Sequence, residues 1–289
     1  MKKVGFVGLG RMGSGISQQL IRHGYELTVF DINEKNAQQF ADQATIAANL
    51  DQVLNSSDVI FLSLPGSPQV EETVGHFLSY GVTGKTIIDL STSYPLSSKK
   101  LYEQVKSAGG QFADASLTGT PVHAREGNLI VTMGGDEQTY EQCLPMMKTF
   151  ASRGIYYVGG PGAGNVAKLA NNYLSIMYVA LYAEIFPLAE KLGLDTEKLF
   201  EIIGQSGVNC AMYQSNAAKI VRKTYEPSFS LDLALKDLSY VKKLFEEYQI
   251  PSFVLEGGLT LLQLGHLKGY GDKDLSEMAR VTREIMKME

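Results

Sequence analysis

The stretch that decides the fold is Val4-Gly5-Phe6-Val7-Gly8-Leu9-Gly10-Arg11-Met12-Gly13, near the start of the chain. Its first part, Val4–Val7, is short, apolar and β-branched, which predicts a buried strand. The next segment, Ser14–Arg22, is amphipathic and is followed by Gly24, which predicts a helix with a glycine after its last turn. The sequence therefore predicts a strand that turns through three glycines directly into a helix.

This glycine pattern is typical of turns that bind the pyrophosphate of a dinucleotide. Gly8 allows the tight turn, Gly10 lets the backbone approach the phosphates, and Gly13 permits the helix to pack closely on the strand. The helix that follows offers unpaired N–H groups and a favourable dipole to anions. We therefore expect Gly8, Gly10, Arg11, Met12 and Gly13 to contact a dinucleotide cofactor.

An acidic residue supports this interpretation. Asp31 ends the next predicted strand, where a carboxylate accepts hydrogen bonds from the adenosine ribose and repels a 2′-phosphate. This favours NAD as the cofactor, with NADP as the alternative. The competing interpretation is a structural glycine turn followed by an Asp31 that caps a helix beginning in Ile32-Asn33-Glu34.

The first half of the chain alternates short apolar runs with helical segments, which predicts a parallel sheet wrapped by helices. Beyond Gly159-Gly160-Pro161-Gly162 only helical patterns follow, and the first of them, Ala163–Leu192, is long and apolar on nearly all faces. We predict an α/β Rossmann domain with a mainly parallel, doubly wound sheet over residues 1–162. An all-α domain over residues 163–289 follows, joined by the long helix. The expected strands are Val4–Val7, Leu27–Phe30, Val59–Leu64, Thr86–Asp89, Gln111–Ala113, Leu129–Met133 and Ile155–Tyr157.

Composition excludes several classes of protein. The chain has 289 residues and a formal charge of −5, so it offers no basic field for nucleic acid. Its two cysteines, Cys143 and Cys210, have no metal-like or disulfide-like spacing, and we expect no metal site and a cytoplasmic location. The apolar stretch Leu174–Leu188 is too short and polar to span a membrane. The apolar surface of the long helix favours a homodimer or homotetramer.

Two further loops follow predicted strands, where open α/β sheets bind their ligands. Leu64 and Pro65 lie in the first, although a simple proline turn explains them as well. In the second, Ser91-Thr92-Ser93, the hydroxyl groups either cap the next helix or face the cofactor, and the pattern alone favours capping.

A polar stripe marks the predicted long helix. Lys168, Asn172 and Ser175 are spaced by four and three residues and share one face, with Asn171 beside them. A buried lysine with a lowered pKa would donate a proton to a carbonyl oxygen as hydride reaches its carbon, and Asn172 would orient that oxygen. The alternative is a lysine whose stem lies along apolar surface while its ammonium reaches water, with the two asparagines capping a helix or crossing to a neighbouring helix.

In the order and spacing of its motifs the sequence resembles the β-hydroxyacid dehydrogenase family, which includes 3-hydroxyisobutyrate dehydrogenases, tartronate semialdehyde reductases and sulfolactaldehyde reductases. The motifs are the glycine-rich start, Asp89-Leu90-Ser91-Thr92, the segment 114–135, Gly162–Asn172, and Phe229 through Lys236-Asp237-Leu238. The resemblance implies that Lys168 is the catalytic acid/base, assisted by Asn172 and Asn171. It also implies that Lys236 lies near the nicotinamide and that Leu64, Pro65 and Thr92 contact the cofactor.

The resemblance further implies that Thr118, Gly119 and Thr120 bind the acid group of a small anionic substrate, with Ser175 near it. The chain departs from the family pattern at Ser116-Leu117 and at Thr120-Pro121, and it has His123 and Arg125 where small residues are common. We therefore expect an NAD(P)-dependent oxidoreductase that interconverts a small acidic aldehyde, such as a semialdehyde or a sulfolactaldehyde-like compound, and its β-hydroxy acid. The alternatives are an imine reductase and a dinucleotide-binding regulatory protein without catalysis.

Overall fold

The computed structural model describes residues 3–288, so Met1, Lys2 and Glu289 lie outside the described part of the chain. The chain forms two compact units, one up to Lys168 and one from Leu169 onward. The sequence places the boundary six residues earlier, after Gly162. Both positions lie at or near the first turns of one helix, α8 (Ala163–Lys191).

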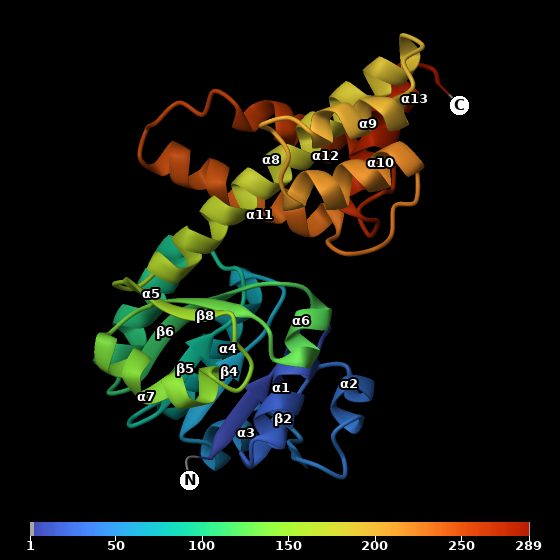
Figure 1. Ribbon diagram of the computed structural model, residues 1–289. Coiled ribbons are helices and arrows are strands. Elements are labelled where there is room, and N and C mark those ends of the chain that lie inside the picture. Colours follow the sequence, from blue (N-terminus) through green and yellow to red (C-terminus); the bar gives the residue numbers. More distant parts are fainter. Residues whose placement is uncertain (1–2, 289) are drawn as a thin grey trace. The chain divides into compact units, whose positions relative to one another are not determined.

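The first unit is built on one eight-stranded sheet with the order β3-β2-β1-β4-β5-β6-β7-β8. Figure 1 shows the strands of this sheet with helices packed against them. All neighbouring pairs are parallel except β6 and β7, which are antiparallel. The predicted α/β class with a mainly parallel sheet and a following helical region is confirmed. The strands are β1 (Val4–Val7), β2 (Leu27–Phe30), β3 (Thr45–Ile46), β4 (Val59–Leu62), β5 (Thr86–Asp89), β6 (Gln111–Thr118), β7 (Ile130–Gly134) and β8 (Gly154–Gly159).

Two strands differ most from the sequence prediction, while the ends of β4, β7 and β8 differ from it by one or two residues. β3 was not expected, because its two residues at the sheet edge are too few to show a period. β6 was predicted to end at Ala113 but continues to Thr118. Asp114 and Ser116 interrupt the apolar pattern, yet both are buried because β6 is paired on both sides. The extension makes Thr118 the last residue of a strand.

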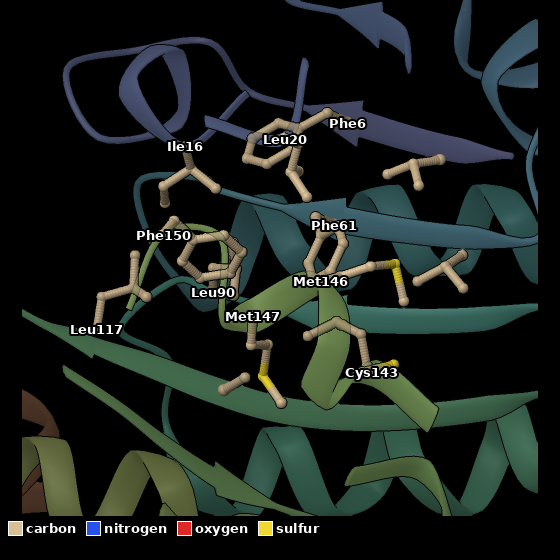
Figure 2. Packing of buried hydrophobic residues seen from close by; sticks show 14 of the residues in the cluster. Phe6, Ile16, Leu20, Phe61, Leu90, Leu117, Cys143, Met146, Met147 and Phe150 are labelled. Atoms are coloured by element: carbon tan, nitrogen blue, oxygen red, sulfur yellow. The ribbon is translucent and has the colours of Figure 1, made fainter. Parts of the chain in front are cut away.

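Helices connect these strands, and their apolar faces form the core. Figure 2 shows part of it, where Phe6 and Phe61 from adjacent strands pack with Ile16 and Leu20 of α1 and with Phe150. This packing holds the carboxyl end of β1 in place beneath the glycine-rich turn. The helices are α1 (Gly13–Arg22), α2 (Glu34–Gln38), α3 (Leu50–Ser56), α4 (Ser67–Tyr80), α5 (Pro95–Ser107), α6 (Pro121–Glu126) and α7 (Glu137–Met147).

The second unit is helical throughout its described residues, apart from connecting loops and one isolated β-bridge between Ser230 and Asp274. Pro187 lies inside α8 without ending it. The further elements are α9 (Thr196–Gly204), the π-helix η1 (Tyr213–Ala217), α10 (Ala218–Arg222), α11 (Leu231–Glu247), α12 (Leu255–Leu267), the 3₁₀-helix η2 (Leu275–Glu277) and α13 (Met278–Ile285).

The apolar surface of α8 is divided between two faces. Leu169, Ile176, Val179 and Phe186 are buried. A second set is exposed and recurs every three or four residues, which places it along one side of the helix. It consists of Leu174, Tyr178, Leu181, Ile185 and Leu188, and we call it the α8 stripe.

Candidate active site

The glycine-rich turn between β1 and α1 depends on the absence of side chains at two positions. Gly8 has a φ of +93°, and a Cβ there would collide with the carbonyl oxygen of Ser63. A Cβ at Gly13 would collide with the carbonyl oxygen of Gly8. At Gly10, by contrast, a Cβ would meet no described atom within 4 Å. The turn is therefore tightly packed on its inner side and open at Gly10.

The amino end of α1 suits an anionic group. No side chain caps it, and its first turn contains no acidic residue. Its backbone N–H groups and the helix dipole therefore face an anion without competition from a carboxylate. The exposed Arg11 and the half-buried Met12 complete the turn. These features fit the pyrophosphate of a dinucleotide, which this turn would hold.

Asp31 lies where β2 ends and links the turn to the next loop. Its Oδ2 accepts a hydrogen bond from the Leu9 N–H at 2.6 Å, and its Oδ1 accepts one from the Asn33 N–H at 2.8 Å. It does not cap α2, because the cap is Asn33, whose side chain accepts from the Lys35 N–H. Each carboxylate oxygen has a further lone pair, so Asp31 retains the capacity to accept from a ribose hydroxyl.

The loops after β4 and β5 are tied to each other. The Leu64 N–H donates to Ser91 Oγ at 2.9 Å, and the Ser93 hydroxyl donates to Asp89 Oδ2 at 2.7 Å. The prediction that a hydroxyl of residues 91–93 caps the next helix was wrong. The cap of α5 is Tyr94, without a side-chain hydrogen bond, because the two serines are committed to these loop contacts. Pro65 and Thr92 lie in these loops, at the carboxyl edge of the sheet.

The expected anion-binding residues occupy the junction between β6 and α6. Thr118 ends the strand opposite Ile130, and Gly119 has a φ of +143°. Thr120 caps α6: its N–H donates to His123 Nδ1 at 3.1 Å, while its hydroxyl faces the His123 N–H. The Thr120 N–H is thus engaged by His123. Arg125 is exposed.

A buried polar network fixes the first turn of α8. Asp114 accepts hydrogen bonds from the N–H groups of Gly162 and Asn165, each at 2.7 Å. The side-chain oxygen of Asn165 accepts from the Ser93 N–H and the Ser116 hydroxyl, and its amide nitrogen donates to Ser98. Burial raises the pKa of Asp114 to about 7, against the opposing effect of the two N–H donors.

The sequence reasoning missed Asn165 and did not single out Asp114. Both positions carried a signal, since a polar residue in an apolar strand and an Asn at the start of an apolar helix each need a hydrogen-bonding partner. A Cβ at Gly164 would lie 2.5 Å from the Asp114 carbonyl oxygen, so backbone and side chains pack tightly here. The network anchors the helix that carries Lys168.

The polar residues of α8 differ in their environments. Lys168, in the first unit, is half-buried. In the second unit, Asn172 is buried, and its side-chain oxygen accepts from the exposed Asn171 at 3.2 Å. Ser175 donates its hydroxyl proton to the Asn171 carbonyl oxygen at 2.5 Å. Asn171, Asn172 and Ser175 thus form a local group on α8.

Helix α11 contributes to the same unit. Asn172 Nδ2 donates to Asp237 Oδ2 at 2.6 Å, across 65 residues of sequence. Lys236 Nζ lies 3.1 Å from Asp237 Oδ1 and 5.3 Å from the centre of the Tyr240 ring. The structure therefore brings the predicted residues Asn172 and Lys236 to one carboxyl group, that of Asp237.

In residues 3–288, no helix has the length and apolar character needed to cross a membrane. In the same part of the chain, no group of three or more His, Cys, Asp or Glu side chains is arranged to hold a metal ion.

Comparison with known families identifies the class of protein. Residues 3–179 match the NAD binding domain of 6-phosphogluconate dehydrogenase. Residues 162–282 match the family described as NAD-binding of NADP-dependent 3-hydroxyisobutyrate dehydrogenase. Together with the glycine-rich turn, these matches define a dinucleotide-dependent oxidoreductase.

Individual proteins similar to this chain are enzymes of the same class. The chain is 32% identical over 242 residues to 2-hydroxy-3-oxopropionate reductase of Escherichia coli K12, covering 82% of each chain. It is 32% identical to 2-(hydroxymethyl)glutarate dehydrogenase of Eubacterium barkeri, covering 98% of this chain and 95% of the relative. Among solved structures, Mycobacterium tuberculosis 3-hydroxyisobutyrate dehydrogenase, studied with L-serine, has a TM-score of 0.89 and 25% identity, covering 98% and 99% of the two chains. The chain belongs to the β-hydroxyacid dehydrogenase family and is an NAD(P)-dependent enzyme.

Proposed function

We propose that the enzyme interconverts a small acidic aldehyde and the corresponding β-hydroxy acid, with Lys168 as the general acid and base. The observation that carries the proposal is the half-buried Lys168 on α8, with the buried Asn172 one helical turn further along the same helix. Lys168 therefore lies on the same helix as a buried amide that could hold a substrate oxygen. In a hydroxyacid dehydrogenase, the reacting oxygen is the group that requires a proton donor.

A nicotinamide dinucleotide held by the glycine-rich turn and Asp31 would supply or accept the hydride. In the direction of reduction, Lys168 Nζ donates a proton to the carbonyl oxygen as that oxygen gains charge, and it accepts the proton in the reverse direction. Asn172 orients the same oxygen through a side-chain N–H. The contribution of the chain is thus positioning combined with proton transfer.

The acid group of the substrate is assigned to the segment Thr118–Thr120, with Asn171 and Ser175 as further polar contacts. Gly119 leaves its own backbone exposed, which supports close approach of an anion. Because the Thr120 N–H is engaged by His123, the Thr118 hydroxyl and the Gly119 N–H are the donors we assign to the acid group. Activity with 3-hydroxyisobutyrate or with the alcohol of sulfolactaldehyde distinguishes a carboxylate from a sulfonate as that group.

NAD is the proposed cofactor in preference to NADP. Asp31 supports this, because its carboxylate stands at the end of β2 and would repel a 2′-phosphate on the adenosine ribose. Lys236 is assigned to the nicotinamide end of the cofactor. Leu64, Pro65 and Thr92 are assigned to its contacts with the carboxyl edge of the sheet.

The test is NAD⁺ and NADP⁺ reduction with 3-hydroxyisobutyrate, glycerate, the alcohol of sulfolactaldehyde, 4-hydroxybutyrate and serine. We expect one strong NAD⁺-linked substrate. We also expect Lys168→Ala to bind NADH normally but to lose about 10²–10⁴-fold in kcat. Lys191→Ala, an exposed lysine at the end of the same helix, is the matched control and should retain full turnover.

The alternatives give different outcomes in the same assays. Turnover of cyclic imines with NADPH, but of no hydroxy acid, would replace the proposal with imine reduction. NADH binding without turnover of any substrate would indicate a regulatory protein. Full activity of Lys168→Ala would refute the assigned role of this lysine.

We further propose that the α8 stripe is covered by a second copy of this chain. Leu174 to Leu188 spans about 21 Å of helix at 1.5 Å per residue. In an isologous interface the identical stripes of two copies would pack against each other and bury their apolar side chains. Light scattering should give at least twice the mass of one chain, and Leu181→Lys should lower it. A monomeric wild-type protein would refute this assembly.

A further inference from the structure

We propose that Asp237 is a positioning residue that determines which end of the Asn172 side-chain amide faces the substrate. The inference rests on the proposed function, which assigns Asn172 to the reacting oxygen. It concerns residues of the second unit, on α8 and α11.

The contact between Asn172 and Asp237 joins an amide nitrogen to a carboxylate oxygen. Asn172 Nδ2 lies 2.6 Å from Asp237 Oδ2, and both side chains are buried. A carboxylate oxygen only accepts hydrogen bonds, so the nitrogen of the amide must face it. If the amide turned by 180°, its oxygen would meet the carboxylate oxygen, and two acceptors would repel each other. Asp237 therefore excludes the opposite orientation.

The oxygen at the other end of the Asn172 amide also has a protein partner. Asn172 Oδ1 accepts a hydrogen bond from Asn171 Nδ2 at 3.2 Å. One N–H and the oxygen of Asn172 thus have protein partners. The remaining N–H on the same nitrogen is the donor that the proposed mechanism requires. A charged acceptor on the first N–H holds the amide plane more strongly than a neutral one would.

The second oxygen of the Asp237 carboxyl group faces Lys236. Asp237 Oδ1 is shielded from water and makes no aligned hydrogen bond among the described residues, but Lys236 Nζ stands 3.1 Å from it. Burying a carboxylate whose second oxygen lacks an aligned hydrogen-bond donor lowers the stability of the fold. A purely stabilising role therefore does not explain why Asp237 is at this position. The ion pair with Lys236 offsets part of this cost. Asp237 thereby also sets the position of the lysine assigned to the cofactor.

The experiment compares three variants. Asp237→Leu has a similar shape but removes both acceptors, and we expect kcat to fall about 100-fold with a much smaller change in KM. Asp237→Asn keeps one acceptor oxygen and should fall about tenfold. Asp232→Asn, an exposed Asp of the same helix paired with His266, is the matched control and should keep wild-type kcat.

A spectroscopic readout separates positioning from stability. In ¹⁵N-labelled protein, the side-chain amide signal of Asn172, assigned by its loss in Asn172→Ser, should be shifted and protected from exchange in the wild type and in Asp232→Asn. It should lose both properties in Asp237→Leu. An unchanged signal, or an unchanged kcat in folded Asp237→Leu, would overturn the inference.

The spectrum needs no turnover, so it tests Asp237 even if the proposed reaction is wrong. If the wild type is inactive on every substrate, the proposed function fails, and the amide signal alone decides whether Asp237 orients Asn172.

Discussion

The glycine-rich turn of the first unit and the Asn172–Asp237–Lys236 group of the second are built in opposite ways. In the turn, backbone atoms occupy the space that side chains would otherwise fill, and all the residues lie within one short stretch of sequence. In the second group, side chains from α8 and α11 meet across 65 residues. A site made by the backbone therefore leaves a visible pattern in the sequence, whereas a site made by packing does not.

The largest effect is expected at the buried polar network around Asn165, which lies at the start of α8 in the first unit. Asn165→Ala should lower the free energy of unfolding by about 3 kcal/mol, because it strands the buried Ser93 N–H and the Ser116 hydroxyl and removes the N–H that donates to Ser98. Urea unfolding measures this. The exposed helical Asn55→Ala should change it by less than about 0.5 kcal/mol, and equal losses in the two variants would contradict the network.

The glycine turn gives the next effect. Gly13→Ala forces a Cβ against the Gly8 carbonyl oxygen and should cost about 2 kcal/mol of stability, measured by thermal unfolding. Gly10→Ala has open space and should unfold like the wild type but bind NADH more weakly. If Gly10→Ala binds NADH normally, the backbone at this position does not approach the cofactor.

Asp114 provides a pH test of the anchor of α8. Its pKa is about 7 in the folded protein and near 3.8 when unfolded, so between these values the folded state holds the extra proton. Its contribution to stability is therefore fully present below about pH 4 and declines as the pH rises to about 7. The unfolding free energy of the wild type, relative to Asp114→Asn, should fall progressively across this window. A difference that rises with pH would show that the N–H donors outweigh burial.

The smallest effect concerns cofactor choice. Asp31→Asn removes a negative charge from the end of β2 while keeping an acceptor for Leu9 or Asn33. We expect the ratio of kcat/KM with NADP⁺ to kcat/KM with NAD⁺ to rise about tenfold, or about 1.4 kcal/mol. An unchanged ratio would mean that Asp31 serves only the loop hydrogen bonds.

The sequence by itself determined the strand–turn–helix start, most strands of the sheet, the change to an all-helical second half, and the family. These features depend on local sterics and on the period of apolar residues, which are written in consecutive positions. Gly8 and Gly13 illustrate this, because no other residue fits where the backbone passes so closely.

Only the tertiary structure decided which polar groups meet. It paired Asn172 with Asp237, joined Asn165 to Asp114, engaged the Thr120 N–H with His123, and used Ser91 and Ser93 in loop contacts instead of a helix cap. The physical reason is that a hydrogen bond requires a partner at about 3 Å, and chain folding selects that partner among residues far apart in sequence. A polar side chain in an apolar helix or strand shows that a partner is needed, while its identity depends on how the elements pack.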